Sequence, residues 1–286
     1  MDVVPRGLHR FSTGFSGRTV LEVLSTPWRL IYMLTLTANQ WNTVYNVFSF
    51  GLVSMLACTI YTLVSQARVL PKYRNALVMS SMVTFIAGYH YWRIFNSFSE
   101  ATAEGGTAVN LSGEPGSFNE AYRYVDWLLT VPLLLVEVIA VLALAKELAR
   151  SLIVRLVPAS AAMIALGYPG EIATDQGTQI MYGVLSTIPF IYILYVLFVE
   201  LGKSLDRQPA GVAASVKNLR LLLIATWGVY PIAYCFNVWG DASSDSFVAI
   251  QLGYTIADVL AKCVFGLTIL KIARMKSHAE GMAADH

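Results

Sequence analysis

The stretch "AYRYVDWLLTVPLLLVE", Ala121–Glu137, is almost wholly apolar, yet it contains the ionisable residues Arg123, Asp126 and Glu137. A charge at the middle of a lipid bilayer costs about 2.5–3.5 kcal/mol on insertion scales. Ionisable side chains in such a helix therefore normally face a protein interior, where they mark a path for ions or protons. The stretch predicts a membrane-spanning helix with one polar face.

The composition of the whole chain also indicates a membrane protein. Of its 286 residues, 56% are hydrophobic and 13% are charged, and the mean hydropathy is +0.57. Soluble domains typically contain about 25% charged residues. The net charge of +2 gives no reason to expect a nucleic-acid partner. Cys58, Cys235 and Cys263 lie inside apolar segments, which favours buried core residues over a disulfide framework.

Apolar segments long enough to cross a bilayer recur along the chain, each of about 18 residues or more. They cover approximately residues 41–65, 75–98, 121–146, 149–167, 178–201, 217–239 and 247–272. The short connectors between them predict one all-α bundle of seven transmembrane helices. We expect residues 1–40 to form an N-terminal extension, 41–273 the helical domain and 274–286 a tail.

The charges of the connectors predict the orientation of the bundle. Alternate connectors and the C-terminus are basic, whereas the others are acidic. The basic residues are Arg68, Lys72, Arg74, Lys146, Arg150, Lys203, Arg207, Lys217, Lys271, Arg274 and Lys276; the acidic ones are Glu100, Glu104, Glu114, Glu120, Glu171, Asp175, Asp241 and Asp245. Because positive loops stay in the cytoplasm, the C-terminus is expected there and the N-terminus outside.

The N-terminal extension disagrees with this charge pattern, because it contains Arg6, Arg10, Arg18 and Arg29 on the expected outer side. Two interpretations remain open. The extension is either a signal peptide that ends near the apolar run "LIYMLTLTA" or an amphipathic segment that rests on the membrane surface.

The ionisable residues of the third segment lie along one helical face. Asp126 and Thr130 are four residues apart and share a face. Asp126 and Glu137 are eleven residues apart, which is about three turns and roughly 16 Å of rise. Arg123 lies one turn outward of Asp126. Hydrogen bonding between helices is the alternative explanation, but an ordered series of Arg, Asp, Thr and Glu favours a path for ions or protons.

The seventh segment contains a lysine in an apolar helix. In "GYTIADVLAKCVFG", Asp258 precedes Lys262 by four residues, so the two side chains are neighbours. A buried lysine is costly unless it is paired, and a desolvated amine is the usual former of Schiff bases. A purely structural ion pair is the alternative. Lys262 is the first candidate for a functional residue.

These motifs together resemble the microbial rhodopsins of the proteorhodopsin and xanthorhodopsin group. "RYVDWLLTVPLLLVE" is similar to the third-helix signature of that group, and "GYHYWR" resembles its second-helix histidine motif. "WGVYP" resembles the sixth-helix part of the retinal pocket, and "DVLAK" resembles the site of the retinal-bearing lysine. The matches cover all seven segments in order and leave out the first 40 residues.

The resemblance implies a role for each matching residue. Lys262 would bind all-trans retinal as a protonated Schiff base, with Asp126 and Asp258 as counterions and Arg123 on the exit side. His90 would hydrogen-bond Asp126, or would be an ordinary core histidine. The residues Trp127, Trp227, Tyr230 and Pro231 would line the chromophore, and Tyr91 and Tyr230 would hydrogen-bond Asp258.

The series Asp126, Thr130 and Glu137 matches the acceptor, threonine and donor of outward proton pumps. In that mechanism the Schiff base loses its proton to Asp126 on the outer side. Glu137 then returns a proton from the cytoplasmic side, where apolar surroundings favour its neutral form. The resemblance therefore implies a light-driven proton transporter, neither an enzyme nor a metalloprotein. It would be a multi-pass, homo-oligomeric protein of a bacterial-type plasma membrane, with lipids and protons as its partners.

Two finer expectations also rest on the resemblance. Leu134 lies where leucine, rather than glutamine, accompanies green absorption. Gly183 lies where bacteriorhodopsin-like sequences have tryptophan, and in the xanthorhodopsin type this glycine opens a window for a hydroxylated or keto carotenoid antenna. A helix-packing glycine is the alternative.

Three other classes of protein share part of this pattern. A light sensor that signals to a transducer would share Lys262 and Asp258 but has no need of a donor such as Glu137. A ligand-activated seven-helix receptor would not require Lys262. A light-gated channel would need a hydrated path, which the sequence does not exclude.

Overall fold

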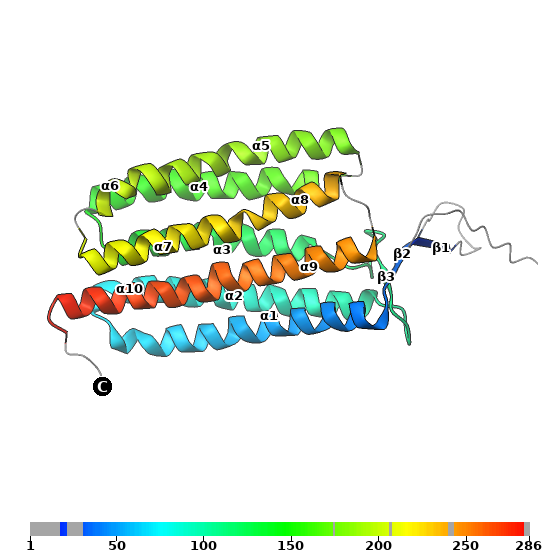
Figure 1. Cartoon of the computed structure of the whole chain (residues 1–286), viewed down its shortest axis with the longest axis horizontal. Helices are drawn as coiled ribbons and strands as arrows, with labels where there is room; N and C mark the ends of the chain where they lie inside the picture. The colour runs from blue at the N-terminus through cyan, green and yellow to red at the C-terminus, as the bar shows by residue number, and fades with distance from the viewer. Residues whose placement is uncertain (1–17, 22–30, 174, 206–207, 240–242, 283–286) are drawn as a thin grey trace, which may run out of the picture.

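The computed structural model describes residues 18–21, 31–173, 175–205, 208–239 and 243–282. In this part of the chain the helices form seven rods that lie roughly parallel, and a small sheet lies beyond one end of them (Figure 1). The last helix finishes at the opposite end of the bundle. We call these the sheet end and the tail end.

Each of the seven predicted segments corresponds to one rod, although three rods are interrupted. The rods are α1 (Ala38–Val64, extended by a 3₁₀ turn, Ser65–Arg68); α2 (Pro71–Ala101); α3 (Ala121–Leu142); α4 (Lys146–Glu171); α5 (Gln176–Tyr195) with a π-helical turn (Val196–Glu200) and α6 (Gly202–Leu205); α7 (Ala210–Trp227) with α8 (Val229–Trp239); and α9 (Ser244–Val259) with a π-helical turn (Leu260–Val264) and α10 (Phe265–Ala279).

The rods close into one bundle. Each of the first five rods packs against the next along the chain, and the sixth rod packs against α5 through α8. The seventh rod contacts α1, α2, α3 and α7, so that it fills the side of the bundle between the first and sixth rods. Residues of the seventh rod can therefore meet residues of α2 and α3.

Local sequence signals explain where several rods begin and end. At the start of α1, the Thr37 hydroxyl accepts the Gln40 N–H at 3.2 Å and the Gln40 side chain accepts the Thr37 N–H at 2.8 Å, which is a capping box. The predicted third span, 121–146, was too long at its C-terminal end. The helix ends at Leu142 because Ala143 adopts a left-handed conformation with φ 47°.

The bundle places apolar side chains outside and ionisable ones inside. On α5, Val184, Ile188 and Ile191 are each about 60% exposed, whereas Asp126 and Lys262 are each 2% exposed. In the described residues, five helical ranges are long and apolar enough to cross a membrane: 38–68, 121–142, 146–171, 176–200 and 211–236. An apolar exterior is what a lipid solvent requires.

The described residues depart from an all-α fold in one place, a three-stranded antiparallel sheet of β1 (Arg18–Leu21), β2 (Ile31–Thr35) and β3 (Ala108–Asn110). β3 belongs to the connector between α2 and α3, and Leu34 of β2 is paired with Val109 of β3. Both side chains are buried. The apolar run that was expected to end a signal peptide or a surface segment is thus partly a strand, while residues 1–17 and 22–30 lie outside the described residues.

Candidate functional site

Lys262 lies at the middle of the bundle, on the π-helical turn of the seventh rod, and is 2% exposed. Its Nζ lies 3.0 Å from Oδ2 of Asp126 on α3, and it also forms an ion pair with Oδ1 of Asp258, one turn earlier on its own rod. Both carboxylates are buried as well. The structure therefore brings together the lysine and both aspartates that the sequence predicted.

Asp258 is held by side chains from three other helices. Its Oδ2 accepts a hydrogen bond from the Tyr91 hydroxyl of α2 at 2.8 Å, and its Oδ1 accepts one from the Tyr230 hydroxyl of α8 at 2.7 Å. The indole N–H of Trp127 on α3 also donates to Oδ1, at 3.3 Å. The two predicted tyrosine hydrogen bonds are thus formed. These donors fix a charged Asp258 beside Lys262.

The neighbourhood of Asp126 differs from the prediction in one respect. Nδ1 of His90 lies 4.0 Å from Oδ1 of Asp126, which is too long for a hydrogen bond. That nitrogen is instead 2.9 Å from the carbonyl oxygen of Ile86, one turn earlier on α2. The predicted hydrogen bond is not formed, because the imidazole is engaged by its own helix. Oδ1 of Asp126 has no hydrogen-bond partner.

The other residues of the α3 stripe are buried but lie apart from the lysine. The Thr130 hydroxyl donates to the Asp126 backbone carbonyl at 2.8 Å rather than to its carboxylate. Arg123 is 2% exposed and lies over the rings of Phe48, Tyr91 and Tyr254. In the described part of the chain no hydrogen bond or ion pair joins its guanidinium to either aspartate.

Arg123 instead points toward the sheet end, where the sequence analysis missed a partner. Its Nη2 donates to Oε1 of Gln251 at 2.6 Å, and Nε2 of Gln251 donates to Oε1 of Glu120 at 2.6 Å. Gln251 could have been found by spacing, because Gln251, Thr255, Asp258 and Lys262 follow one another at intervals of four, three and four residues. All four are buried.

Glu137 lies on the tail-end side of Lys262 and is fully buried. In the part of the chain that the structure describes, neither carboxyl oxygen has a partner at good hydrogen-bond geometry. Ser80 of α2 is a polar neighbour of this carboxyl group, and its hydroxyl oxygen is also without a partner. A carboxyl group in such surroundings is far more stable when it is neutral than when it is charged.

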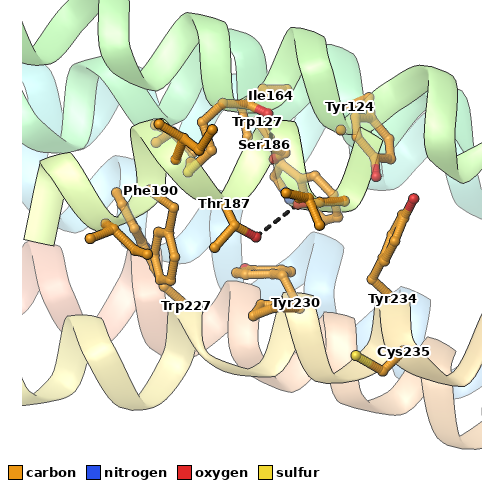
Figure 2. A pocket seen from close by; sticks show the side chains of 18 of the residues that line it. Tyr124, Trp127, Ile164, Ser186, Thr187, Phe190, Trp227, Tyr230, Tyr234 and Cys235 are labelled. Atoms are coloured by element: carbon orange, nitrogen blue, oxygen red, sulfur yellow. Dashed lines mark hydrogen bonds between the residues drawn. The ribbon is translucent and has the colours of Figure 1, made fainter. Parts of the chain in front are cut away.

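A mainly apolar cavity of about 490 Å³ extends from Lys262 between α3, α4, α5 and α8. The four residues that were predicted to line the chromophore, Trp127, Trp227, Tyr230 and Pro231, line it together with Leu134, whereas Tyr91 does not. Figure 2 shows Trp227, Tyr230, Thr187 and Phe190 around the same space. The sequence analysis missed the contribution of α4, which includes Met163, Ile164 and Gly167. A lysine amine in an apolar cavity is the arrangement that a Schiff base with an apolar carbonyl compound requires.

Gly183 lines the same cavity on the α5 side. A Cβ atom at Gly183 would lie 2.9 Å from Cε1 of Tyr234, so the missing side chain makes room for the Tyr234 ring. The Tyr234 hydroxyl donates to the Gln179 carbonyl at 2.6 Å, which holds the ring there. In Figure 2 Tyr234 and Tyr124 point toward one another. The neighbouring Val184 and Ile188 line the cavity and are also exposed, so this side of the cavity reaches the outer surface of the bundle.

Comparison with known proteins gives consistent matches. The sequence profile of bacteriorhodopsin-like proteins matches residues 42–275. A green-light absorbing proteorhodopsin from Gamma-proteobacterium EBAC31A08 is 31% identical over 236 residues, which are 82% of this chain and 88% of that protein. A thermophilic rhodopsin structure is 44% identical, with a TM-score of 0.82 over 86% of this chain and 98% of the other. Xanthorhodopsin, described as a light-driven ion pump with dual chromophore, is 46% identical, with a TM-score of 0.80 over 87% of this chain and 99% of the other.

Proposed function

This chain belongs to the bacteriorhodopsin-like family, whose members are retinal-binding multi-pass membrane proteins, and from that premise we propose that it is a light-driven pump that moves protons outward. The observation that carries the proposal is the position of Lys262 Nζ between the carboxylates of Asp126 and Asp258. The residues fit retinal, because a mainly apolar cavity meets a single buried amine. When bound to Lys262, retinal supplies a light-driven isomerisation that changes the surroundings of the nitrogen.

The two carboxylates differ in a way that assigns their roles. Both oxygens of Asp258 accept hydrogen bonds from fixed side chains, so Asp258 serves as a permanent counterion. Within the described residues Oδ1 of Asp126 accepts no hydrogen bond, and we assign proton acceptance to this oxygen. Asp126 is the primary acceptor. His90, 4.0 Å away, tunes that acceptor electrostatically, and Thr130 fixes the helix turn that carries it.

The direction of transport follows from the order of groups along the bundle. Arg123 and Asp126 lie on the sheet-end side of Lys262, and Glu137 lies about three turns from Asp126 toward the tail end. Glu137 would hold a proton in the resting state and would supply it toward the nitrogen of Lys262 once Asp126 has been protonated. The acidic connectors at the sheet end and the basic ones at the tail end support an outward direction.

A carotenoid antenna is the finer part of the proposal. The cavity reaches the outer surface beside Gly183, and a ring-ended carotenoid would pack there against Tyr234 and the exposed side chains of α5. The 46% identity with xanthorhodopsin, described as having a dual chromophore, supports this proposal. Leu134 lines the cavity and is proposed to set green absorption.

Illumination of cells that express the protein with retinal, in an unbuffered medium, tests the proposed function. We expect an external pH electrode to record acidification that a protonophore abolishes. Asp126→Asn should remove the signal and shift the absorption band to longer wavelength, because a neutral residue no longer stabilises the Schiff-base charge.

Asp245→Asn is the matched control for Asp126→Asn, because Asp245 is exposed at the sheet end and hydrogen-bonds the side chain of Gln40. It should acidify the medium as the parent does. Light-driven alkalinisation that a protonophore enhances would show that another ion is transported. A photocycle without any proton movement would favour the sensor.

A further inference from the structure

The carbonyl oxygen of Leu142, at the C-terminal end of α3, is a meeting point of three rods. Nζ of Lys276 on α10 donates to it at 2.6 Å, and Nε2 of Gln208, in the connector before α7, donates to it at 3.5 Å. The left-handed Ala143 ends α3 here and leaves this carbonyl without a helical partner. A side chain of the seventh rod and the side chain of Gln208 therefore satisfy the last turn of the third rod.

Lys276 is unusual among the tail-end lysines because it is buried. Its relative exposure is 6%, whereas Lys271 on the same helix is exposed. Its ammonium group also lies 5.1 Å from the centre of the Tyr73 ring on α2. A buried cation is costly unless it has strong partners, so the charge-assisted hydrogen bond to Leu142 is the contact that keeps Lys276 inside.

The surrounding contacts hold α10 against α2 as well. The Tyr73 hydroxyl donates to Oε1 of Glu280 at 2.6 Å, and Lys72 forms an ion pair with the other oxygen of Glu280. The Leu70 N–H donates to the Ser277 hydroxyl at 2.9 Å. The second, third and seventh rods are thus tied together around Lys276 at the tail end.

This arrangement lies over Glu137. Leu142 follows Glu137 by five residues, a rise of about 7.5 Å along α3. The side chains between them and around Lys276 belong to one buried apolar cluster that includes Tyr73, Leu77, Val138, Val141 and Ile272. Glu137 is itself fully buried, so protons from the tail-end solution reach it only if this end of the bundle opens.

We propose that Lys276 is a positioning residue for proton uptake: its hydrogen bond to the Leu142 carbonyl holds the tail end of the bundle closed over Glu137. Release of that bond separates α10 from the end of α3, and admits water and a proton to the Glu137 carboxyl group. This inference rests on the proposed role of Glu137 as the proton donor. The bond sets how often the tail end opens, and therefore how fast Glu137 exchanges its proton with the solution.

Hydrogen–deuterium exchange of the Glu137 carboxyl group in the dark tests the inference without any need for pumping. The retinal-loaded protein in lipid is transferred to D₂O, and infrared spectroscopy follows the C=O stretch of the protonated carboxyl group, which Glu137→Gln identifies by its loss. Lys276→Met keeps the volume of the side chain and removes its N–H donors. We expect exchange of the Glu137 carboxyl group to become about 10- to 100-fold faster. Exchange requires local opening of the tail end, and opening becomes easier by this factor when one hydrogen bond to a charged group is lost.

Two variants and one spectrum serve as controls. Lys271→Met makes the same change at an exposed position of the same helix and should exchange at the parent rate. Lys276→Arg retains charged N–H donors and should keep exchange slow. An unchanged visible band shows that each variant is folded.

Several results would overturn the inference. One is that the Glu137 carboxyl group exchanges at the same rate in Lys276→Met and in Lys271→Met. Another is that it exchanges as fast in Lys276→Arg as in Lys276→Met. The third is that the parent spectrum has no protonated carboxyl band that Glu137→Gln removes. A parent protein that fails to acidify the medium, but shows the expected exchange difference, would refute the proposed pump and leave this closure standing.

Discussion

At Lys262 two carboxylates face one amine, and their hydrogen bonds make them unequal. Asp258 accepts from Tyr91, Tyr230 and Trp127, while Oδ1 of Asp126 has no hydrogen-bond partner. A charge that is buried with several donors is stabilised in place, whereas a carboxylate with a free oxygen can be neutralised by a proton without breaking a contact. These unequal surroundings support the proposed roles of Asp258 as the fixed counterion and Asp126 as the acceptor.

Removal of Lys262 should abolish the colour of the protein. Lys262→Ala deletes the amine that lines the cavity, so added retinal has no amine in the cavity to bind covalently. We expect no visible absorption band after reconstitution and light-driven transport at background level. Lys271→Ala changes an exposed lysine of α10, in the same rod, and this variant should bind retinal normally. A visible band that survives in Lys262→Ala would contradict the attachment.

Replacement of the buried Glu137 should slow recovery and leave the colour nearly unchanged. Glu137→Gln keeps the shape of the side chain but cannot hold or deliver a proton, and the residue lies roughly 16 Å along the helix from Asp126. Flash photolysis should show recovery of the ground state slowed by about 100-fold, the lower range for loss of a positioned proton donor. Unaltered recovery at neutral pH would remove Glu137 from the donor role and favour the sensor.

Among the elements, two of the rods that line the cavity, the sixth and the seventh, are irregular close to residues that line it. The sixth rod is interrupted at Gly228, between α7 and α8, three residues before Pro231. Proline lacks an N–H and clashes with the preceding turn, which accounts for the interruption. The seventh rod contains the π-helical turn Leu260–Val264 around Lys262. Such turns are frequent at functional sites because they re-aim a side chain.

The contact of Gly183 on α5 with Tyr234 on α8 leads to a separate prediction. In Gly183→Trp the new side chain would displace Tyr234 and fill the side of the cavity that reaches the surface. We expect loss of carotenoid binding, with retinal binding and pumping intact. An excitation spectrum for transport, recorded with and without added hydroxylated or keto carotenoids, measures both effects. The antenna is refuted if the parent gains no structured blue contribution, or if the tryptophan variant keeps it.

For the whole molecule, the outer surface is apolar and the ionisable side chains are gathered inside or at the two ends. This reversal of the usual pattern of a soluble protein is what a bundle in lipid requires. The connectors at the sheet end are mainly acidic and those at the tail end mainly basic. The direction of pumping therefore depends on which end faces the cytoplasm.

Labelling of single cysteines should establish the orientation. In a Cys235→Ser background, Glu114→Cys places a thiol at the sheet end and Lys203→Cys places one at the tail end, both at exposed positions. A membrane-impermeant maleimide added to intact cells should label position 114 and leave 203 unlabelled, because basic connectors stay in the cytoplasm. Lysed cells should show labelling at both positions. The reverse pattern in intact cells would place the tail end outside and invert the proposed direction.

The amino-acid sequence alone was enough to predict the seven rods, the buried stripe of α3 and the pairing of Lys262 with Asp258. These features depend on hydropathy and on spacing along one helix, which are local properties of the chain. The prediction that Trp127, Trp227, Tyr230 and Pro231 line the chromophore came from resemblance to a family whose fold this chain shares, and all four line the cavity.

Contacts between residues that are far apart in the sequence could be seen only in the tertiary structure. It showed that His90 bonds its own helix rather than Asp126, that Gln251 links Arg123 to Glu120, and that Lys276 closes the end of α3. It also placed strand β2 on the α2–α3 connector and ended α3 at Leu142. Each of these contacts depends on the rotation of each rod about its axis and on its shift along that axis relative to its neighbours. Packing between helices fixes both quantities, whereas the residue pattern along a single helix fixes neither.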